Sequence, residues 1–183
     1  MPALAHRYTV TTTKVTDNKD GTNNYCESYD KLCTLETTEN LLYLLRQLKP
    51  FYESETEIKD NFDAFSINVF KEGIEPQWED PENIDGCSYN LLFKQGSVGN
   101  ILFERLLCYF LLKGYKNLKV NGVKIDIRKN CIKFGIWCRA IPKLHEGSIV
   151  NHELAESLGL DYEANFGFKN HRQLVEKLQS ENK

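Results

Sequence analysis

The chain has 183 residues, a formal net charge of −3 at pH 7 and a pI near 5.9. This length predicts a single globular domain, 1–183, with a sizeable hydrophobic core. The sequence has neither an apolar run long enough to span a membrane nor a signal-peptide pattern, and its net charge argues against non-specific coating of nucleic acid. We therefore expect a soluble protein of the cytoplasm, with the nucleus also open, and no membrane partner.

The first half of the chain predicts two strands and one helix, separated by polar loops. Thr37 or Thr38 is placed to cap the helix, and Pro50 follows its expected end. The segment ENLLYLLRQL in this helix has more leucines than one face of a surface helix needs. The predicted segments are a strand at 7–15, a polar loop that runs to Tyr25, a helix within 37–50, an acidic loop at 53–63 and a strand at 64–71.

The second half predicts more strands and a strongly apolar helix that stops at Gly114. A short link favours an antiparallel hairpin near its centre, although Asn121-Gly122 is a competing turn signal. The predicted segments are a strand at 88–93, a helix at 97–114, strands at 123–128 and 131–138, a helix at 151–160, a strand at 164–168 and a helix at 171–179. Together they predict an α+β fold: a mostly antiparallel sheet with about three helices on one face and a partly polar, open second face.

The cysteines show no CxxC pair, and most lie in apolar surroundings. This pattern predicts reduced, packed thiols rather than a disulfide framework or a zinc site, so we expect no metal and no cofactor. The six residues are Cys26, Cys33, Cys87, Cys108, Cys131 and Cys138.

One basic segment stands out from the acidic average. From Lys113 to Lys143 there are nine basic residues and one acid, Asp126, so this segment carries +8 and the rest of the chain −11. An acidic body with one basic segment suggests a local anionic ligand rather than a track for a nucleic-acid duplex. A Lys-rich strand surface that meets only solvent is the alternative.

Alternation along the two hairpin strands sorts their side chains onto two faces. Apolar residues such as Ile125 and Phe134 are expected to back onto helices. Arg128, Lys133 and Trp137 are then expected together on the opposite face. Each has a plainer interpretation when taken alone, because a tryptophan in an apolar strand is usually core and charged strand residues usually meet solvent.

The other tryptophan lies in GIEPQWED (73–80), which has the composition of a surface turn. An exposed Trp78 offers a π face on which a base stacks, and a cationic base such as N7-methylguanine adds cation–π attraction. The carboxylate of Glu79 accepts two parallel hydrogen bonds, which matches the N1–H and N2 donors of guanine. With Arg128 and Lys133 for attached phosphates, these residues describe a pocket for a methylated guanine nucleotide. Alternatively, Trp78 is a lid over the core edge and Glu79 caps a turn.

The segments GIEPQWEDPEN (73–83) and IRKNCIKFGIW (127–137) resemble the eukaryotic translation initiation factor 4E family, the mRNA cap-binding proteins. The similarity continues through RLLC, SLGL and FGFKNH, so it covers nearly the whole chain. The resemblance implies a curved antiparallel sheet of about eight strands backed by about three helices. It also implies a cap in the concave face and a scaffold or repressor peptide on the helical back. We expect a monomer.

The resemblance also implies roles for individual residues. Trp78 stacks on one face of 7-methylguanine, and Glu79 pairs with its edge. Trp137 contacts the methyl group, while Arg128 and Lys133 hold the phosphates.

Several positions depart from the family pattern. Tyr25 stands where a second stacking tryptophan is usual, with Tyr29 as a less well aligned alternative. Ser88 stands where many members have an arginine, which removes one expected phosphate contact. Leu42 replaces the exposed tryptophan that meets the scaffold peptide, and Thr11 replaces a tryptophan of the N-terminal strand.

The implied function is that of a protein without catalytic activity, which binds the cap and recruits capped mRNA to the initiation machinery through a scaffold like initiation factor 4G. A cap-binding translational repressor with a 4E-binding-protein-like partner is one alternative. A second is an interaction domain that has lost cap binding. An enzyme would use Glu79, Asp80 and Glu82 as metal ligands or as acid and base, but no HExxH or P-loop accompanies them.

Overall fold

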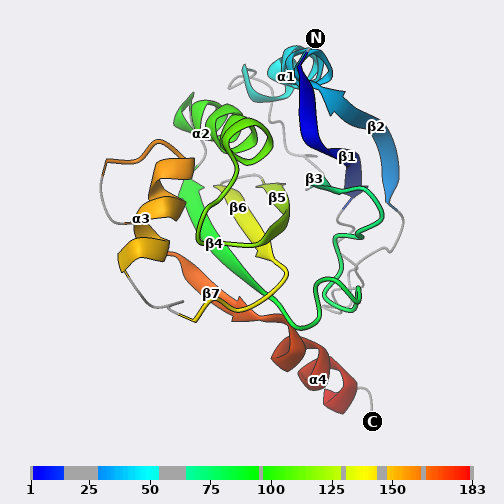
Figure 1. Cartoon of the computed structure of the whole chain (residues 1–183), viewed down its shortest axis with the longest axis vertical. Coiled ribbons are helices and arrows are strands. Elements are labelled where there is room, and N and C mark those ends of the chain that lie inside the picture. The colour runs from blue at the N-terminus through cyan, green and yellow to red at the C-terminus, as the bar shows by residue number, and fades with distance from the viewer. Residues whose placement is uncertain are drawn as a thin grey trace.

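A computed structural model describes residues 2–14, 29–53, 65–94, 97–128, 131–143, 148–161 and 164–181. The strands in these ranges form one antiparallel sheet in the order β2-β1-β3-β5-β6-β4-β7 (Figure 1). The α+β prediction is confirmed, with seven strands and four α-helices in the described part of the chain where about eight and three were expected. The elements are β1 (Ala3–Lys14), β2 (Asp30–Thr37), α1 (Thr38–Glu53), β3 (Phe65–Lys71), β4 (Cys87–Lys94), α2 (Ser97–Cys108), the π-helical turn η1 (Tyr109–Lys113), β5 (Val120–Arg128), β6 (Cys131–Cys138), α3 (Ser148–Ser157), β7 (Gly167–Asn170) and α4 (His171–Glu181).

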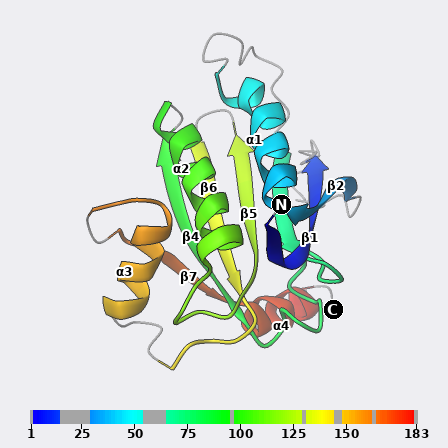
Figure 2. The same cartoon turned by 45° about the horizontal axis from the view of Figure 1, so that its top comes forward.

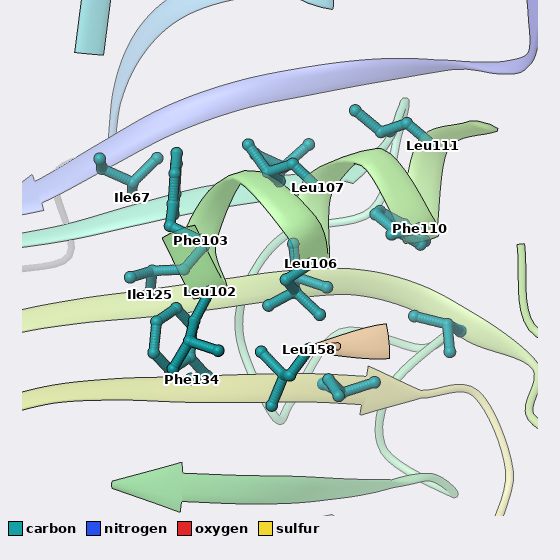
Figure 3. Close-up of a cluster of buried hydrophobic side chains, with 14 of the residues drawn as sticks. Ile67, Leu102, Phe103, Leu106, Leu107, Phe110, Leu111, Ile125, Phe134 and Leu158 are labelled. Atoms are coloured by element: carbon teal, nitrogen blue, oxygen red, sulfur yellow. The ribbon is translucent and has the colours of Figure 1, made fainter. Parts of the chain in front are cut away.

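Helices α1, α2 and α3 pack on one side of the sheet, which we call the helical face (Figures 1 and 2). Helix α4 instead starts at the end of β7 and lies apart from the other three. Figure 3 shows Leu102, Phe103 and Leu106 of α2 over Ile125 of β5 and Phe134 of β6. All five are buried, and each such side chain stabilises the fold by about 1.5–3 kcal/mol. This packing leaves the opposite side of the sheet, the open face, available for polar residues.

Helix α1 begins where the sequence predicts but extends further. Thr37 Oγ1 accepts the N–H of Asn40 at 3.3 Å, and Asn40 Oδ1 accepts the N–H of Thr37 at 3.0 Å. This reciprocal pair caps the first turn, so Thr37 is the cap. The predicted end at Pro50 is wrong, because α1 runs to Glu53. A proline inside a helix costs a hydrogen bond and crowds the preceding turn, which often but not always ends the helix, and here α1 continues for three more residues.

The sequence does not predict β2, the edge strand of the sheet. Of its side chains only Leu35 is buried, and Leu32 points outward with half of its surface exposed. A strand with one buried residue shows little alternation of apolar and polar side chains. Its place in the sheet comes from antiparallel pairing with β1, where Tyr8 is aligned with Leu35.

Strands β5 and β6 form the predicted antiparallel hairpin. Asn121-Gly122 is not a turn, because both residues lie within β5. The register shifts between Val120 and Gly122, so Asn121 is the extra residue of a β-bulge. The bulge matters for the site, because it turns the buried amide of Asn121 toward the loop between β3 and β4.

The predicted stop at Gly114 is confirmed. Helix α2 passes into η1, and the Gly114 N–H donates to the carbonyl oxygen of Tyr109 at 2.7 Å. Gly114 has a φ of 73°, which L-residues other than glycine rarely adopt.

The predicted free thiols are confirmed for the cysteines that the structure describes, whereas Cys26 lies outside the described residues. Cys87 and Cys138 face each other across β4 and β6 and are fully buried in the core. Within the described ranges, no helix combines the length and the apolar character that a bilayer crossing requires.

Candidate functional site

The open face is formed by strand residues that point away from the helices. The strand register aligns Trp137 with Ser88 on one side and with Gly122 on the other, and it aligns Lys133 with Asp126. Because side chains alternate along a strand, residues in these rows share one face. The open face includes Ser66, Asn68 and Phe70 of β3, Ser88 of β4, Lys124, Asp126 and Arg128 of β5, Lys133 and Trp137 of β6, and Lys169 of β7.

Trp137 is a buried side chain of this face, with 5% of its surface exposed. Its ring packs against Phe70 with centroids 5.6 Å apart and against His171 with centroids 4.6 Å apart. The ring of Trp78, which is half-buried, lies nearly parallel to it, with centroids 6.5 Å apart and planes 15° apart. The structure therefore brings together the two tryptophans that the sequence singles out.

The loop that carries Trp78 is held by one buried amide. Asn83 is fully buried, and its Nδ2 donates to the carbonyl oxygens of Glu75 and Gln77 at 2.8 and 3.0 Å. These two carbonyls lie on the chain just before Trp78, so the amide fixes the path of the backbone that presents the indole. The carboxylate of Asp80 closes the same loop by accepting the N–H of Glu75 at 2.8 Å.

Two residues from distant elements tie this loop to the sheet. Asn121 Nδ2 donates to the carbonyl oxygen of Glu82 at 2.7 Å and to Asn83 Oδ1 at 3.0 Å. His171 Nδ1 donates to the carbonyl oxygen of Asn83 at 2.8 Å. The imidazole is fully buried, and this burial lowers the pKa of His171 to about 4, so the ring is neutral at pH 7. A neutral ring can pack closely against Trp137 without a desolvated charge.

The acidic residues beside Trp78 have different roles. The side chain of Glu79 is exposed and has no hydrogen bond or ion pair within the described ranges, so its carboxylate is available to a ligand. Asp80 is engaged within the loop, where it also accepts the N–H of Glu82 at 2.8 Å. Glu82 forms an ion pair with Arg139 at 3.1 Å. Asp80 and Glu82 therefore stabilise the loop.

The basic residues of the open face surround one carboxylate. Asp126 accepts the hydroxyl of Ser66 at 2.7 Å. Lys133 Nζ lies 3.6 Å and Lys124 Nζ lies 3.9 Å from its oxygens. Arg128 is exposed and forms no ion pair with any residue that the structure describes. The site thus has a fixed acid at its base and cations around it, which suits an anionic ligand.

The structure places most of the predicted site residues. Trp78 and Trp137 meet at one end of the open face, the exposed Glu79 follows Trp78 in its loop, and Arg128 and Lys133 lie on the same face as Trp137. The remaining residue, Tyr25, falls outside the described residues. Its alternative, Tyr29, is half-buried just before β2.

Further residues of the site that were not predicted from the sequence include Asn83, Asn121, His171 and Lys169. Asn83 and His171 act through hydrogen bonds between segments far apart in the chain, and no local pattern reports such contacts. Lys169 had a usable signal, because its strand lies within the segment FGFKNH that carries the resemblance.

The helical side offers a second exposed surface. On α1, Leu41 and Leu44 are buried, whereas Leu42 and Tyr43 are 54% and 67% exposed. Ile101 of α2 is also exposed. Large exposed apolar side chains on a helix are typical of a surface that binds another protein.

Solved structures with a similar fold come from two nematodes. One is C. elegans eIF4E-3 in complex with the 4E-binding protein Mextli and a cap analog, with a TM-score of 0.70, 18% identity and 95% of each chain covered. The other is Ascaris suum eIF4E-3 in complex with an m2,2,7G cap, with a TM-score of 0.70, 16% identity, and 92% of this chain and 91% of that chain covered. At these identities the likeness concerns the fold.

Sequence relatives carry related names. Eukaryotic translation initiation factor 4E of Candida albicans is 26% identical over 174 residues, which span 92% of this chain and 78% of that protein. The initiation factor 4E homolog of Acanthamoeba polyphaga mimivirus is 30% identical over 121 residues, which span 61% of this chain but only 44% of that longer protein. The model of the family described as "Eukaryotic initiation factor 4E" matches residues 3–183, and the chain therefore belongs to that family.

Proposed function

We propose that this protein binds the 7-methylguanosine 5′ cap of mRNA on its open face and acts in translation initiation. The observation that carries the proposal is that Trp78, which the exposed Glu79 follows in the loop, lies beside Trp137, at one end of a face that also presents Arg128 and Lys133. Family membership supports it, as does the similarity in fold to proteins solved with a cap analog and with an m2,2,7G cap.

Base recognition is assigned to the loop that holds Trp78. The indole stacks on the methylated guanine, and the exposed Glu79 carboxylate accepts the N1–H and N2–H donors of its edge. Trp137 contacts the methyl group from within the sheet. Tyr25 supplies the second stacking ring, from a segment outside the described residues. Because methylation at N7 makes the base cationic, the aromatic rings favour it over guanine by about 0.5–2 kcal/mol.

Phosphate binding is assigned to the strands of the sheet. Lys133 is oriented by Asp126, and Arg128 offers a planar fork of donors to a phosphate. Because these residues belong to the paired strands β5 and β6, their spacing is fixed before the ligand arrives. The site therefore divides into a loop that reads the base and a sheet that holds the charge.

We further propose that capped mRNA is recruited through a scaffold peptide bound on the helical side, around Leu42 and Tyr43 of α1. A translational repressor is the second candidate, since C. elegans eIF4E-3 has been solved with the 4E-binding protein Mextli. Either role is that of a monomeric, cytoplasmic binding protein without catalytic activity.

Calorimetric titration with 7-methyl-GTP and with GTP tests cap binding. We expect the methylated nucleotide to bind about 2- to 30-fold more tightly. Trp78→Ala should nearly abolish binding because it removes the stacking surface. Glu79→Gln should weaken binding more than about tenfold, because the amide turns a donor toward a donor and loses a charged acceptor. Glu75→Gln is the matched control, since Glu75 is exposed in the same loop.

Equal affinity for the two nucleotides would mean that the cap-binding proposal is wrong and that this is an interaction domain. The helical surface is tested separately with an immobilised peptide of the YxxxxLΦ type. Leu42→Asp should abolish its retention, and Leu178→Asp, which changes an exposed leucine of α4, should not. If Leu42→Asp retains the peptide as well as the wild type does, the peptide does not bind around Leu42.

A further inference from the structure

The open face holds more positive charge than its own acid can balance. Among the described residues, four cations and one carboxylate lie on this face, which leaves an excess of three positive charges. Like charges on a folded surface repel one another, so a protein that keeps them together gains when an anion binds between them. These residues are Lys124, Arg128, Lys133, Lys169 and Asp126.

Lys169 is the member of this group that neither the hairpin motif nor its spacing predicts. It lies on β7, and the register pairs it with Ser88 of β4, which in turn pairs with Trp137 of β6. Its side chain therefore lies on the open face. Ser88 is buried and uncharged, so at this level of the sheet Lys169 is the residue that brings charge.

The electrostatic surroundings of Lys169 agree with the position that the strand register gives it. Partial burial is the main cause that lowers the pKa of Lys169, and Lys133 and Arg128 lower it further, while Asp126 raises it. Lys133, Arg128 and Asp126 all lie on the open face, which is the face that the register assigns to Lys169. The β7 residue thus reaches the same charged cluster as the hairpin residues.

The cations differ in how far they are already neutralised. Lys124 and Lys133 share Asp126, at 3.9 and 3.6 Å. Lys169 and Arg128 form no ion pair with any side chain in the described ranges, and both are exposed. Within the described ranges, the two are therefore accessible and have no direct ion-pair partner, while their neighbour Lys133 lies between them along the sheet.

We propose that Lys169 binds the phosphate chain of the nucleotide together with Arg128 and Lys133. This inference rests on the proposed function and deepens it. The three cations come from β7, β5 and β6, so a chain of phosphates laid across the sheet meets one cation from each strand. At Ser88, where the resemblance leads one to expect an arginine, the charge is then supplied by the neighbouring strand instead.

The test compares ligands that differ only in phosphate number. Calorimetry with 7-methyl-GMP and 7-methyl-GTP gives the ratio of the two dissociation constants. In Lys169→Gln this ratio should shrink by about fivefold, because affinity for the triphosphate falls while affinity for the monophosphate stays nearly unchanged. Lys169→Arg should keep the ratio close to that of the wild type. Lys177→Gln, which makes the same charge change on exposed α4, is the control.

Inorganic tripolyphosphate separates this inference from the proposed function, because it lacks the base. The Lys169→Gln variant should also bind tripolyphosphate about fivefold more weakly than the wild type does. If methyl selectivity is absent but this loss is seen, cap recognition fails and the phosphate site stands. If selectivity is present but the phosphate-number ratio matches that of the wild type, the role of Lys169 is wrong. Equal tripolyphosphate affinity in the wild type and Lys169→Gln also contradicts it.

Discussion

Asn83→Ala tests whether the buried amide of Asn83 holds the Trp78 loop in place without affecting the sheet. The amide of Asn83 makes three hydrogen bonds, two to the carbonyls of Glu75 and Gln77 at 2.8 and 3.0 Å and one from Asn121 at 3.0 Å. Alanine leaves all three partners without this group in a place that water does not reach, because Asn83 is fully buried. At about 1 kcal/mol for each bond, the free energy of unfolding should fall by about 3 kcal/mol.

The effect on ligand binding follows from the same contacts. Without the amide, the loop must be ordered when the ligand binds, and a cost of about 1.4 kcal/mol already weakens affinity tenfold. We therefore expect affinity for 7-methyl-GTP to fall at least about tenfold. Tripolyphosphate affinity should stay within about twofold, because Arg128 and Lys133 belong to the strands.

Urea denaturation and calorimetry measure these two quantities on the same preparations. Asn165→Ala is the control, since Asn165 is exposed and its replacement should change stability by less than about 0.5 kcal/mol. If Asn83→Ala unfolds at the same urea concentration as the wild type and binds 7-methyl-GTP equally well, the loop is not held by this amide. A parallel loss of tripolyphosphate binding would show instead that the sheet itself has been disturbed.

Three further predictions concern stability and are measured by urea denaturation. Burial lowers the pKa of His171 to about 4, so as pH falls from about 6.5 the unfolded chain takes up this proton before the folded chain does. The free energy of unfolding should therefore decrease by about 2–3 kcal/mol between pH 7 and pH 4.5. This pH-dependent decrease should be missing in His171→Gln. Gly122→Ala places a Cβ 2.3 Å from the buried ring of Phe70 and should destabilise by about 1–3 kcal/mol or more, whereas Gly167→Ala, with only an ordinary contact at 3.7 Å, should be nearly neutral. Glu153→Ala removes a buried carboxylate that accepts two backbone N–H groups at 2.5 and 3.0 Å. It should lower the free energy of unfolding by about 3–5 kcal/mol. An unchanged urea midpoint would show that these hydrogen bonds contribute nothing to stability.

The sheet part of the candidate site could be predicted from the sequence because it depends on a local rule. Alternation along β5 and β6 and a short link are enough to place Arg128, Lys133 and Trp137 on one face, and the hairpin register confirms this. The same rule fails for β2. Leu35 is its only buried side chain, so the strand has no alternation to detect, and its place in the sheet comes from pairing with β1.

The loop part could not be predicted, because its order comes from contacts between distant segments. The sequence marks Trp78 as a tryptophan in a polar turn, yet Asn83 receives its partners from a bulge in β5 and from the first residue of α4. The Asn121-Gly122 dipeptide even points to a turn when read locally. In the fold its asparagine is instead the donor that ties the Trp78 loop to the sheet.

This division between loop and sheet suggests how selectivity and affinity arise. In the proposed site, charged contacts from the strands attract any nucleotide with several phosphates, because Arg128, Lys133 and Lys169 do not read the base. Selectivity must then come from Trp78 and Glu79, whose loop is held in place by buried hydrogen bonds before a ligand binds. A preformed loop loses little conformational entropy on binding. The free energy of base stacking and of the hydrogen bonds to the guanine edge can therefore contribute in full to discrimination between bases. A buried, neutral His171 fits the same proposal, because a charge beneath Trp137 would repel a cationic base bound at these rings.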